Sequence, residues 1–325
     1  MGYLILDDIA HIDDDIHQKH KATELSEDDV LLNITGASIG RTAIATKEIE
    51  GGNVNQHVCI IRANSKVSPK FLCNYIQTKK IQNYIRSLQT GGSREGLNFE
   101  QIRSFPISLP SIAEQNKIAQ LLDKLNERIA TQNKIIDKLQ SLIKGISGRI
   151  FASIQGIEYR MGDIASITNG DSNVQDAVTE SNDGLYPFFD RSEDIKYLST
   201  FLFDKEAIIY PGEGAEFIPR YFKGKFALHQ RCYAIFDFNE IINAQYLYFY
   251  LKTQNSYFVR NAVGSTVPSL RLDTFQKLKV VVPPKKIQYS VSLCLSSMEQ
   301  KFNVENEILQ MLLKRKQYLL RQMFI

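Results

Sequence analysis

Apolar residues recur three and four positions apart along two long stretches of the chain. In the first stretch they are Leu122, Leu125, Ile129, Ile136, Leu139, Ile143, Ile146 and Ile150. In the second they are Leu295, Met298, Phe302, Leu309, Leu312, Leu319 and Met323. Alternating steps of three and four place these side chains on one seam of an α-helix, as in helices that pack on each other. The pattern therefore predicts two long helices whose seams form a coiled coil.

The two stretches belong to an internal repeat. Residues 55–150 can be laid over residues 228–323 at a constant offset of 173, which places Cys59 on Cys232. The two seams keep the same phase over this length. We therefore expect a duplicated unit, a globule followed by a long helix, that gives the molecule pseudo-two-fold symmetry.

The two helices must run antiparallel if their seams are to meet. The first helix leaves the first globule and ends where the second globule begins, and the second helix leaves the second globule. At about 1.5 Å per residue, the stretch from Ile112 to Ile150 would span roughly 58 Å. Gln132 and Glu305 interrupt the two seams at the same step of the repeat. The alternative is that each helix packs on its own globule.

Each globule has the pattern of a small α+β domain. In the second, apolar runs predict strands at 159–168, 207–210, 227–228, 232–236 and 280–282, with an amphipathic helix at 244–259. In the first, the corresponding strands are 30–34, 59–61 and 107–109, with a helix at 69–88. Segments 91–93 and 264–266 predict loops. We find no strand–turn–helix with a glycine fingerprint, so the predicted class is α+β rather than a doubly wound sheet.

These elements divide the chain into four segments. We predict a first globule at 1–110, a central long helix at 111–153, a second globule at 154–283 and a C-terminal long helix at 284–325. The first globule is expected to be shortened at its N-terminal side, because residues 159–191 have no counterpart there. An opening strand and its first loop would then be missing.

Composition is that of an ordinary globular protein. Of 325 residues, 43% are hydrophobic and 23% are charged, and no apolar run reaches the roughly 18 residues of a membrane span. The chain shows no leader pattern, and its four cysteines form no C-x-x-C pair, so we expect a cytoplasmic protein with reduced thiols. Residues 1–30 carry a net charge of −7, so the remaining residues sum to +10. A basic body is compatible with a polyanionic partner.

Candidate enzyme chemistry is sparse. We expect no hydrolase nucleophile elbow, no dinucleotide loop and no methyltransferase Asn-Pro-Pro-Tyr run. The turn at Pro211-Gly212 lacks the Gly-Lys-Ser/Thr of a phosphate loop. His17 and His20 lie beside three aspartates and fit a solvated acidic segment better than a metal site. We therefore predict no catalytic residue and no bound metal.

Two further histidines lie beside the repeated cysteines. His57 and His229 could in principle activate Cys59 and Cys232 as nucleophiles. Both histidines fall in a strand pattern, which favours satisfied polar groups of the core. The sequence thus indicates a binding protein without chemistry of its own.

Basic and hydroxyl side chains at turns are the candidate ligands for nucleic acid. Arginine suits bidentate contacts with guanine edges, and lysine mostly neutralises phosphate. The alternative, residue by residue, is that these are ordinary solvated charges. The candidates are Thr35, Ser38, Arg41, Lys80 and Arg94 in the first unit and Arg191, Arg220, Lys223, Arg231 and Arg271 in the second.

The segment LPSIAEQNKIAQLLDKLNERI (109–129) carries a family resemblance. It is similar to the start of the central conserved helix in specificity subunits of type I restriction–modification systems. NITGASIGRTAI (33–44) resembles a glycine turn of the same family more weakly. The second copy departs from the pattern, because Pro284-Lys285-Lys286-Ile287-Gln288 replaces Ser-Ile-Ala-Glu-Gln.

The resemblance implies a non-catalytic, sequence-specific subunit. Its two globules would be target-recognition domains that each read half of a bipartite site in double-stranded DNA, separated by the two antiparallel helices. Two modification subunits would methylate adenine with S-adenosylmethionine, and restriction subunits would use ATP and Mg, with no membrane involved. The alternatives are a structural or regulatory coiled-coil protein, an enzyme in its own right, and a silent recombination cassette without an active complex.

Overall fold

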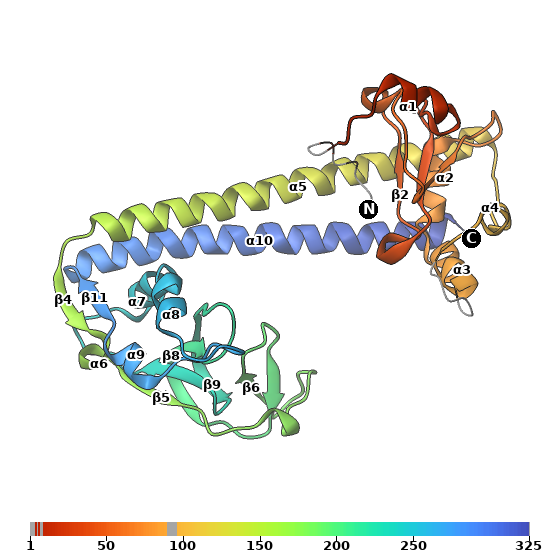
Figure 1. The fold of residues 1–325 in the computed structure, drawn as a ribbon. Helices are drawn as coiled ribbons and strands as arrows, with labels where there is room; N and C mark the ends of the chain where they lie inside the picture. The colour runs from red at the N-terminus through yellow and green to blue at the C-terminus, as the bar shows by residue number, and fades with distance from the viewer. Residues whose placement is uncertain (1–3, 5, 7–8, 90–95, 325) are drawn as a thin grey trace. The chain divides into compact units, whose positions relative to one another are not determined.

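The computed structural model describes residues 4, 6, 9–89 and 96–324 and divides into two compact units. Unit 1 comprises Met1–Lys134 and Asn306–Ile325, and unit 2 comprises Ile135–Glu305. The chain crosses between them only within α5 (Ile112–Ser153) and α10 (Lys285–Met323) (Figure 1). Each unit therefore combines one globule with parts of both long helices.

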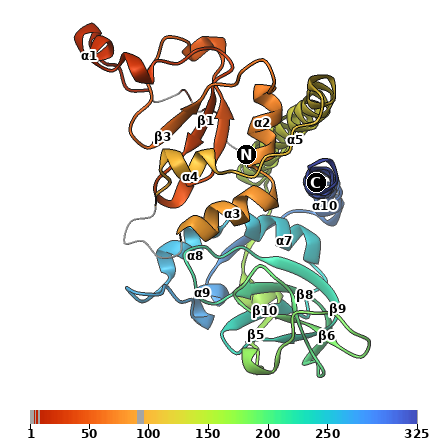
Figure 2. The same ribbon diagram turned by 90° about the vertical axis from the view of Figure 1, so that its right-hand side faces the viewer.

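Unit 1 is built on a three-stranded antiparallel sheet with the order β2-β1-β3. The strands are β1 (Val30–Asn33), β2 (Thr42–Ile44) and β3 (Val58–Ile61). The helices are α1 (Asp14–Lys19), α2 (Pro69–Ile76), α3 (Lys79–Gln89) and α4 (Phe99–Arg103), with short 3-10 turns η1 (Lys21–Thr23), η2 (Gly36–Ser38) and η3 (Lys47–Ile49). The buried face of α2 joins the sheet to the long helices (Figure 2).

In unit 1 the start of α5 packs against the end of α10. Ile118 and Leu122 of α5 share one core with Leu319 and Met323 of α10. Phe324, which follows α10, places its ring 5.0 Å from that of Phe71 in α2. The two helices are therefore antiparallel in this unit, with α2 fastened to both.

Unit 2 contains a six-stranded sheet with the order β5-β10-β8-β9-β6-β7. Its strands are β5 (Ser166–Asn169), β6 (Tyr186–Phe189), β7 (Lys196–Leu198), β8 (Phe203–Pro211), β9 (Arg220–Leu228) and β10 (Cys232–Phe236). A separate antiparallel pair joins β4 (Ile157–Arg160) to β11 (Lys279–Val282). The helices are α6 (Met161–Ile164), α7 (Ala244–Lys252), α8 (Asn255–Asn261) and α9 (Leu272–Gln276), with a 3-10 turn η4 (Val174–Asp176).

In unit 2 the end of α5 packs with the start of α10 and with α7. Ile146 and Ile150 of α5 join the core that contains Leu295 of α10. The ring of Phe151 lies 5.6 Å from that of Tyr246 and 5.5 Å from that of Tyr250, both in α7. The helices are antiparallel here as well, and α7 occupies the place that α2 has in unit 1 (Figures 1 and 2).

The predicted fold class is confirmed, with two mixed α+β globules and two long antiparallel helices. Every predicted seam residue is buried or half-buried, as a heptad seam requires. The polar seam residues Gln132 and Glu305 are only 6% and 7% exposed, and Lys316, which lies on the second seam between Leu312 and Leu319, is 9% exposed. Burial lowers the pKa of Lys316, whose charged form would otherwise be solvated.

A buried glutamine joins each long helix to its own globule in the same way. In α5, the Gln115 side chain donates to the Lys66 and Pro110 carbonyls and accepts from the Ser68 amide. Ser68 is the N-cap residue of α2. The three distances lie between 2.9 and 3.0 Å.

In α10, Gln288 makes the corresponding three bonds. It donates to the Ile241 and Pro283 carbonyls and accepts from the amide of Asn243, the N-cap residue of α7. Both glutamines are almost fully buried, at 1% and 0% exposure. The departure of the second repeat from the family pattern therefore keeps the glutamine that bonds the start of α10 to its globule.

Several predicted elements are interrupted. The predicted strand 159–168 is split by α6, and the predicted helices 69–88 and 244–259 each break into two. Residues 107–109 form no strand, although their counterpart β11 does. β11 is held by β4, and no strand in the described part of unit 1 plays that role.

The constant offset of the repeat is also too simple. α9 begins 173 residues after α4, and α10 begins 173 residues after α5. The N-caps Ser68 and Asn243, however, lie 175 residues apart. Insertions in the loops shift the strands and caps, whereas the helix seams keep their phase.

The glutamine contacts predict a stability difference. Gln288→Leu should lower the free energy of unfolding by about 1–3 kcal/mol, because it removes the partner of the buried Pro283 carbonyl and of the part-buried Asn243 amide and Ile241 carbonyl. Gln115→Leu should have a similar effect. Gln300→Leu, an exposed substitution in the same helix, is the control for denaturant unfolding. If Gln288→Leu unfolds like Gln300→Leu, the glutamine does not secure the helix.

Candidate nucleic-acid interface

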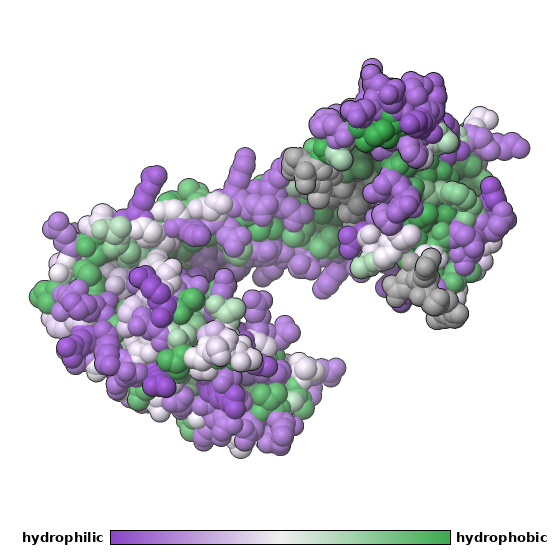
Figure 3. All heavy atoms as spheres, viewed as in Figure 1, coloured by the Kyte–Doolittle hydropathy of each residue, from purple (hydrophilic) through white to green (hydrophobic). Residues whose placement is uncertain are grey.

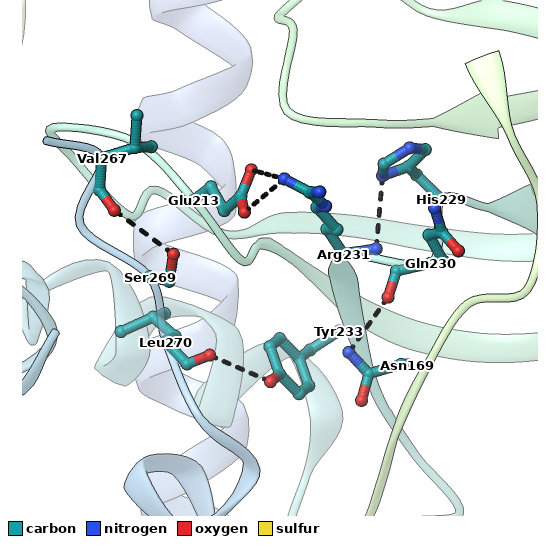
Figure 4. Close-up of polar contacts among 9 residues, drawn as sticks. All are labelled: Asn169, Glu213, His229, Gln230, Arg231, Tyr233, Val267, Ser269 and Leu270. Atoms are coloured by element: carbon teal, nitrogen blue, oxygen red, sulfur yellow. Dashed lines mark hydrogen bonds and ion pairs between the residues drawn. The ribbon is translucent and has the colours of Figure 1, made fainter. Parts of the chain in front are cut away.

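Three strand ends of unit 2 meet at one place. Cys232, the first residue of β10, faces Pro211 at the end of β8. Its neighbour Tyr233 faces Asn169 at the end of β5. The turn 229–231, which precedes β10, is therefore held between the ends of β5 and β8 (Figure 4).

The side chain of Arg231 is anchored to Glu213 in this turn. Its Nη1 donates to Glu213 Oε1 at 2.8 Å and to Oε2 at 3.1 Å (Figure 4). The Arg231 side chain is 63% exposed and that of Glu213 is 18% exposed. The less exposed carboxylate thus orients an accessible guanidinium.

The backbone of the turn is fixed as well. Asn169 Nδ2 donates to the Gln230 carbonyl at 3.3 Å, and the Arg231 amide donates to His229 Nδ1 at 3.2 Å. Gly212 lies so close that a Cβ there would meet the Arg231 carbonyl oxygen at 1.9 Å. Only glycine leaves the turn this space.

The loop before α9 completes the cluster. The Leu270 amide donates to the Gly212 carbonyl at 2.8 Å, and Tyr233 Oη donates to the Leu270 carbonyl at 3.0 Å (Figure 4). Ser269 pairs with Glu213 through a short antiparallel bridge. The loop is therefore locked to the segment that carries Glu213.

A cavity of about 270 Å³ lies in this cluster. Burial raises the pKa of Asp190, but hydrogen bonds from Lys196 at 2.6 Å and from Ser192 outweigh it and leave that pKa lowered. Burial lowers the pKa of His229 and raises that of Cys232 to about 11. The cavity thus offers guanidinium donors beside an imidazole and a thiol that are neutral at pH 7. Its lining residues are Asp190, Arg191, Glu213, His229, Gln230, Arg231 and Cys232.

Unit 1 carries a related but simpler cluster. Thr35 Oγ1 and His57 Nδ1 form a hydrogen bond of 2.6 Å. The Leu97 amide donates to the Ile34 carbonyl at 2.8 Å, and Thr35 pairs with Gly96. A wide cleft of about 2100 Å³ adjoins this cluster and is lined in part by Arg41 and His57.

The structure brings some of the predicted contact residues together. Arg191 and Arg231 line the cavity of unit 2, and the exposed Arg271 directly follows Leu270. Thr35, Ser38 and Arg41 lie around η2 in unit 1. Arg191 and Arg231 thus belong to the cluster of unit 2, Thr35 belongs to that of unit 1, and Arg41 lines the adjoining cleft.

Other candidates lie elsewhere. Lys80 is exposed on α3 and Lys223 on β9, outside both clusters, and Arg94 lies outside the described residues. Arg220 is half-buried, donates through Nη2 to the Ser192 carbonyl and has its Nη1 shielded from solvent. It supports the segment beside Arg191 instead of standing free on the surface, because its guanidinium bonds to the Ser192 carbonyl.

Two expectations about the histidines and serine need correction. His57 and His229 lie in turns that precede β3 and β10, not within strands. The letters of Gly36–Gly40 do match G-x-S-x-G, contrary to the expectation. Ser38 nevertheless ends a 3-10 turn between two strands, whereas a nucleophile elbow joins a strand to a helix.

Sequence reasoning missed Glu213, which holds Arg231. An acidic side chain opposes the charge of a polyanion, so its residue type does not suggest a role in a nucleic-acid interface. The signal was present in a shared feature: Thr35 and Glu213 each follow a strand end and precede a glycine with positive φ, Gly36 at 68° and Gly214 at 145°.

On the face of unit 2 that Figure 3 shows, hydrophilic side chains dominate and hydrophobic ones are scattered. Across the part of the chain that the structure describes, no three His, Cys, Asp or Glu side chains are grouped to hold a metal ion. Within the same residues no helix is long and apolar enough to cross a membrane.

A family model describes most of the chain. The model of the type I restriction modification DNA specificity domain matches residues 7–141 and again residues 157–314. The two matches follow the internal repeat and include both polar clusters.

Curated relatives are about a quarter identical to the chain over the residues that align. The specificity subunit of the type I restriction enzyme EcoDI from Escherichia coli is 28% identical over 127 residues, 39% of this chain and 28% of that protein. The putative type I specificity subunit S.MpnORF365P of Mycoplasma pneumoniae is 26% identical over 220 residues, 64% of this chain and 80% of that protein. The match with the first relative thus covers less than a third of its length.

A solved structure has the same fold. The S subunit of a type I restriction-modification system from M. genitalium superposes with a TM-score of 0.69 at 18% identity. The superposition covers 92% of this chain and 83% of that one. At this identity the likeness concerns the fold alone.

The close approach at Gly212 predicts a sharp effect of one methyl group. Gly212→Ala should lower the free energy of unfolding by about 1–3 kcal/mol, because the added Cβ forces the Arg231 turn away from β8. Gly148→Ala, on an exposed position of α5 with open space around it, should instead raise stability by up to about 1 kcal/mol. Calorimetry that finds both variants equally stable would contradict the described geometry.

Proposed function

The chain belongs to the type I restriction modification DNA specificity family, and we propose that it binds double-stranded DNA as the non-catalytic specificity subunit of such a system. Unit 1 would read one half of a bipartite target and unit 2 the other. The observation that carries this proposal is the duplication of one polar cluster, at the same strand ends, in the two regions that match the family model.

The chemistry of the unit 2 cluster suits the edges of base pairs. An arginine that presents two N–H groups can bond to both O6 and N7 of guanine in the major groove. Arg231 is accessible and oriented by Glu213, and Arg191 lines the same cavity. The net charge of +10 over residues 31–325 favours a polyanion in general.

The two long helices would set the distance between the two half-sites. They are the only chain connections between the units, and their seams are buried in both. Equivalent positions one turn of DNA apart are separated by about 34–36 Å, and helices of this length exceed that span. A target with two defined halves and an unread spacer follows from such an arrangement.

Catalysis would belong to partner subunits in the cytoplasm. Two modification subunits would bind S-adenosylmethionine and methylate adenine, which must leave the base stack to be reached. Restriction subunits would supply ATP- and Mg-dependent cleavage. The role of this chain is then to hold the duplex in register for them.

Mapping of methylated adenine tests this function. The chain is co-expressed with its cognate modification subunit in a host without adenine methylation, and genomic N6-methyladenine is sequenced. We expect one bipartite motif with a spacer of fixed length. The modification subunit alone should leave the genome unmethylated. Methylation that does not depend on this chain, or none at all when the two proteins co-purify, would contradict the proposal.

A further inference from the structure

Backbone contacts make the two polar clusters equivalent position by position. Leu97 and Leu270 occupy matching places in the repeat, and their amides donate to the carbonyls of Ile34 and Gly212 at the same distance of 2.8 Å. One residue further on, Thr35 pairs with Gly96, and Glu213 pairs with Ser269. Thr35 of unit 1 therefore corresponds to Glu213 of unit 2.

The neighbouring strand supplies the second member of each pair. The register of β1 with β3 continues through the bond from the Ile34 amide to the His57 carbonyl, at 2.9 Å. The register of β8 with β10, continued by one residue, brings Arg231 opposite Gly212. His57 of unit 1 therefore corresponds to Arg231 of unit 2.

In both units the side chains of these two positions bond to each other. In unit 1 the contact joins the Thr35 hydroxyl to the His57 ring, and in unit 2 it joins the Glu213 carboxylate to Arg231 (Figure 4). The fold thus repeats the pair, while the sequence changes its chemistry.

The two pairs offer different numbers of groups to a base. Glu213 takes Nη1 of Arg231, and among described residues no contact engages Nε or Nη2, so these two nitrogens keep their three N–H bonds for another partner. In the His57 ring, the bond to Thr35 takes Nδ1 and leaves Nε2 as the single remaining group. A fork of two donors can read guanine in a bidentate manner, and a single imidazole nitrogen cannot.

We propose that Glu213–Arg231 and Thr35–His57 are the specificity-determining pairs at the same position of the two half-sites. Arg231 reads a guanine in the half bound by unit 2, with Glu213 as its positioning residue. The half bound by unit 1 has no such requirement for guanine at the corresponding position. This inference rests on the proposed function and adds which residues distinguish the halves.

Exchange of the pairs between the units is the test. Methylated adenine is mapped for the complex that contains Arg231→His with Glu213→Thr, and for the reciprocal variant His57→Arg with Thr35→Glu. In the first, discrimination for guanine at one position of the unit 2 half-site should fall by about five-fold to 150-fold, the value of one bidentate contact of about 1–3 kcal/mol. The other half-site should keep its sequence. The reciprocal variant should gain a preference for guanine in the unit 1 half.

Matched variants distinguish a loss of base recognition from a loss of stability. Arg231→Lys keeps the positive charge but lacks the fork, so it should lose the guanine preference while overall affinity for DNA persists. Arg260→His, an exposed substitution on α8 outside the cluster, should leave the motif unchanged. Both should melt close to the unaltered protein.

The outcomes distinguish this inference from the proposed function. If the unaltered complex gives a bipartite motif and the exchanged pair leaves both halves intact, only the assignment of the pairs is overturned. Changes in both halves from the unit 2 variant would overturn it too. If the unaltered complex gives no motif that depends on this chain, the proposed function fails and the inference with it.

Discussion

One buried glutamine at the start of each long helix bonds that helix to its globule, and the arrangement of the globule depends on this contact. Gln115 and Gln288 each bond to the N-cap amide of the helix packed beneath them and to two carbonyls on either side. Because each glutamine side chain is buried and its bonds are buried or part-buried, breaking the contacts would leave polar atoms poorly satisfied. Each globule is therefore fixed to the first turn of its own helix. The proposed function requires a rigid joint of this kind, because in it helix length sets the distance between the two half-sites.

The positions of the other elements in each globule follow from this contact. α2 and α7 are anchored at their N-caps and cover the sheets, and the sheet registers bring strand ends together where the polar clusters form. Both units thus have the same packing of a helix on a sheet, while the side chains at their strand ends differ. Duplication of a scaffold with different contact residues suits a target whose two halves differ.

The sequence predicted the parts that depend on periodicity. Heptad spacing encodes the helix seams directly, so both long helices were found with their phase. The breaks after α2 and α7 were not, because neither glycine nor proline marks them. The hydroxyls of Thr78 and Thr253 bond to the Tyr75 and Tyr250 carbonyls where these helices end. Such local bonds compete with the backbone bonds of a helix, and they leave no trace in the spacing of apolar residues.

Contacts that depend on partners distant in sequence were harder to predict. The segment 107–109 has the composition of a strand but lacks the neighbour that β4 provides for β11. Arg220 is a residue type that often contacts DNA from the surface, but its guanidinium bonds to the Ser192 carbonyl within the protein. Glu213 could not be predicted from its residue type, because its charge opposes that of DNA, yet it orients Arg231.

The most direct test of the account is the spacer length after deletion of seven residues, one heptad, from both α5 and α10. Each helix would shorten by about 10 Å. The account predicts that the methylated motif keeps both half-sequences and loses about three base pairs of spacer; an unchanged spacer in a variant that still folds and methylates would contradict it.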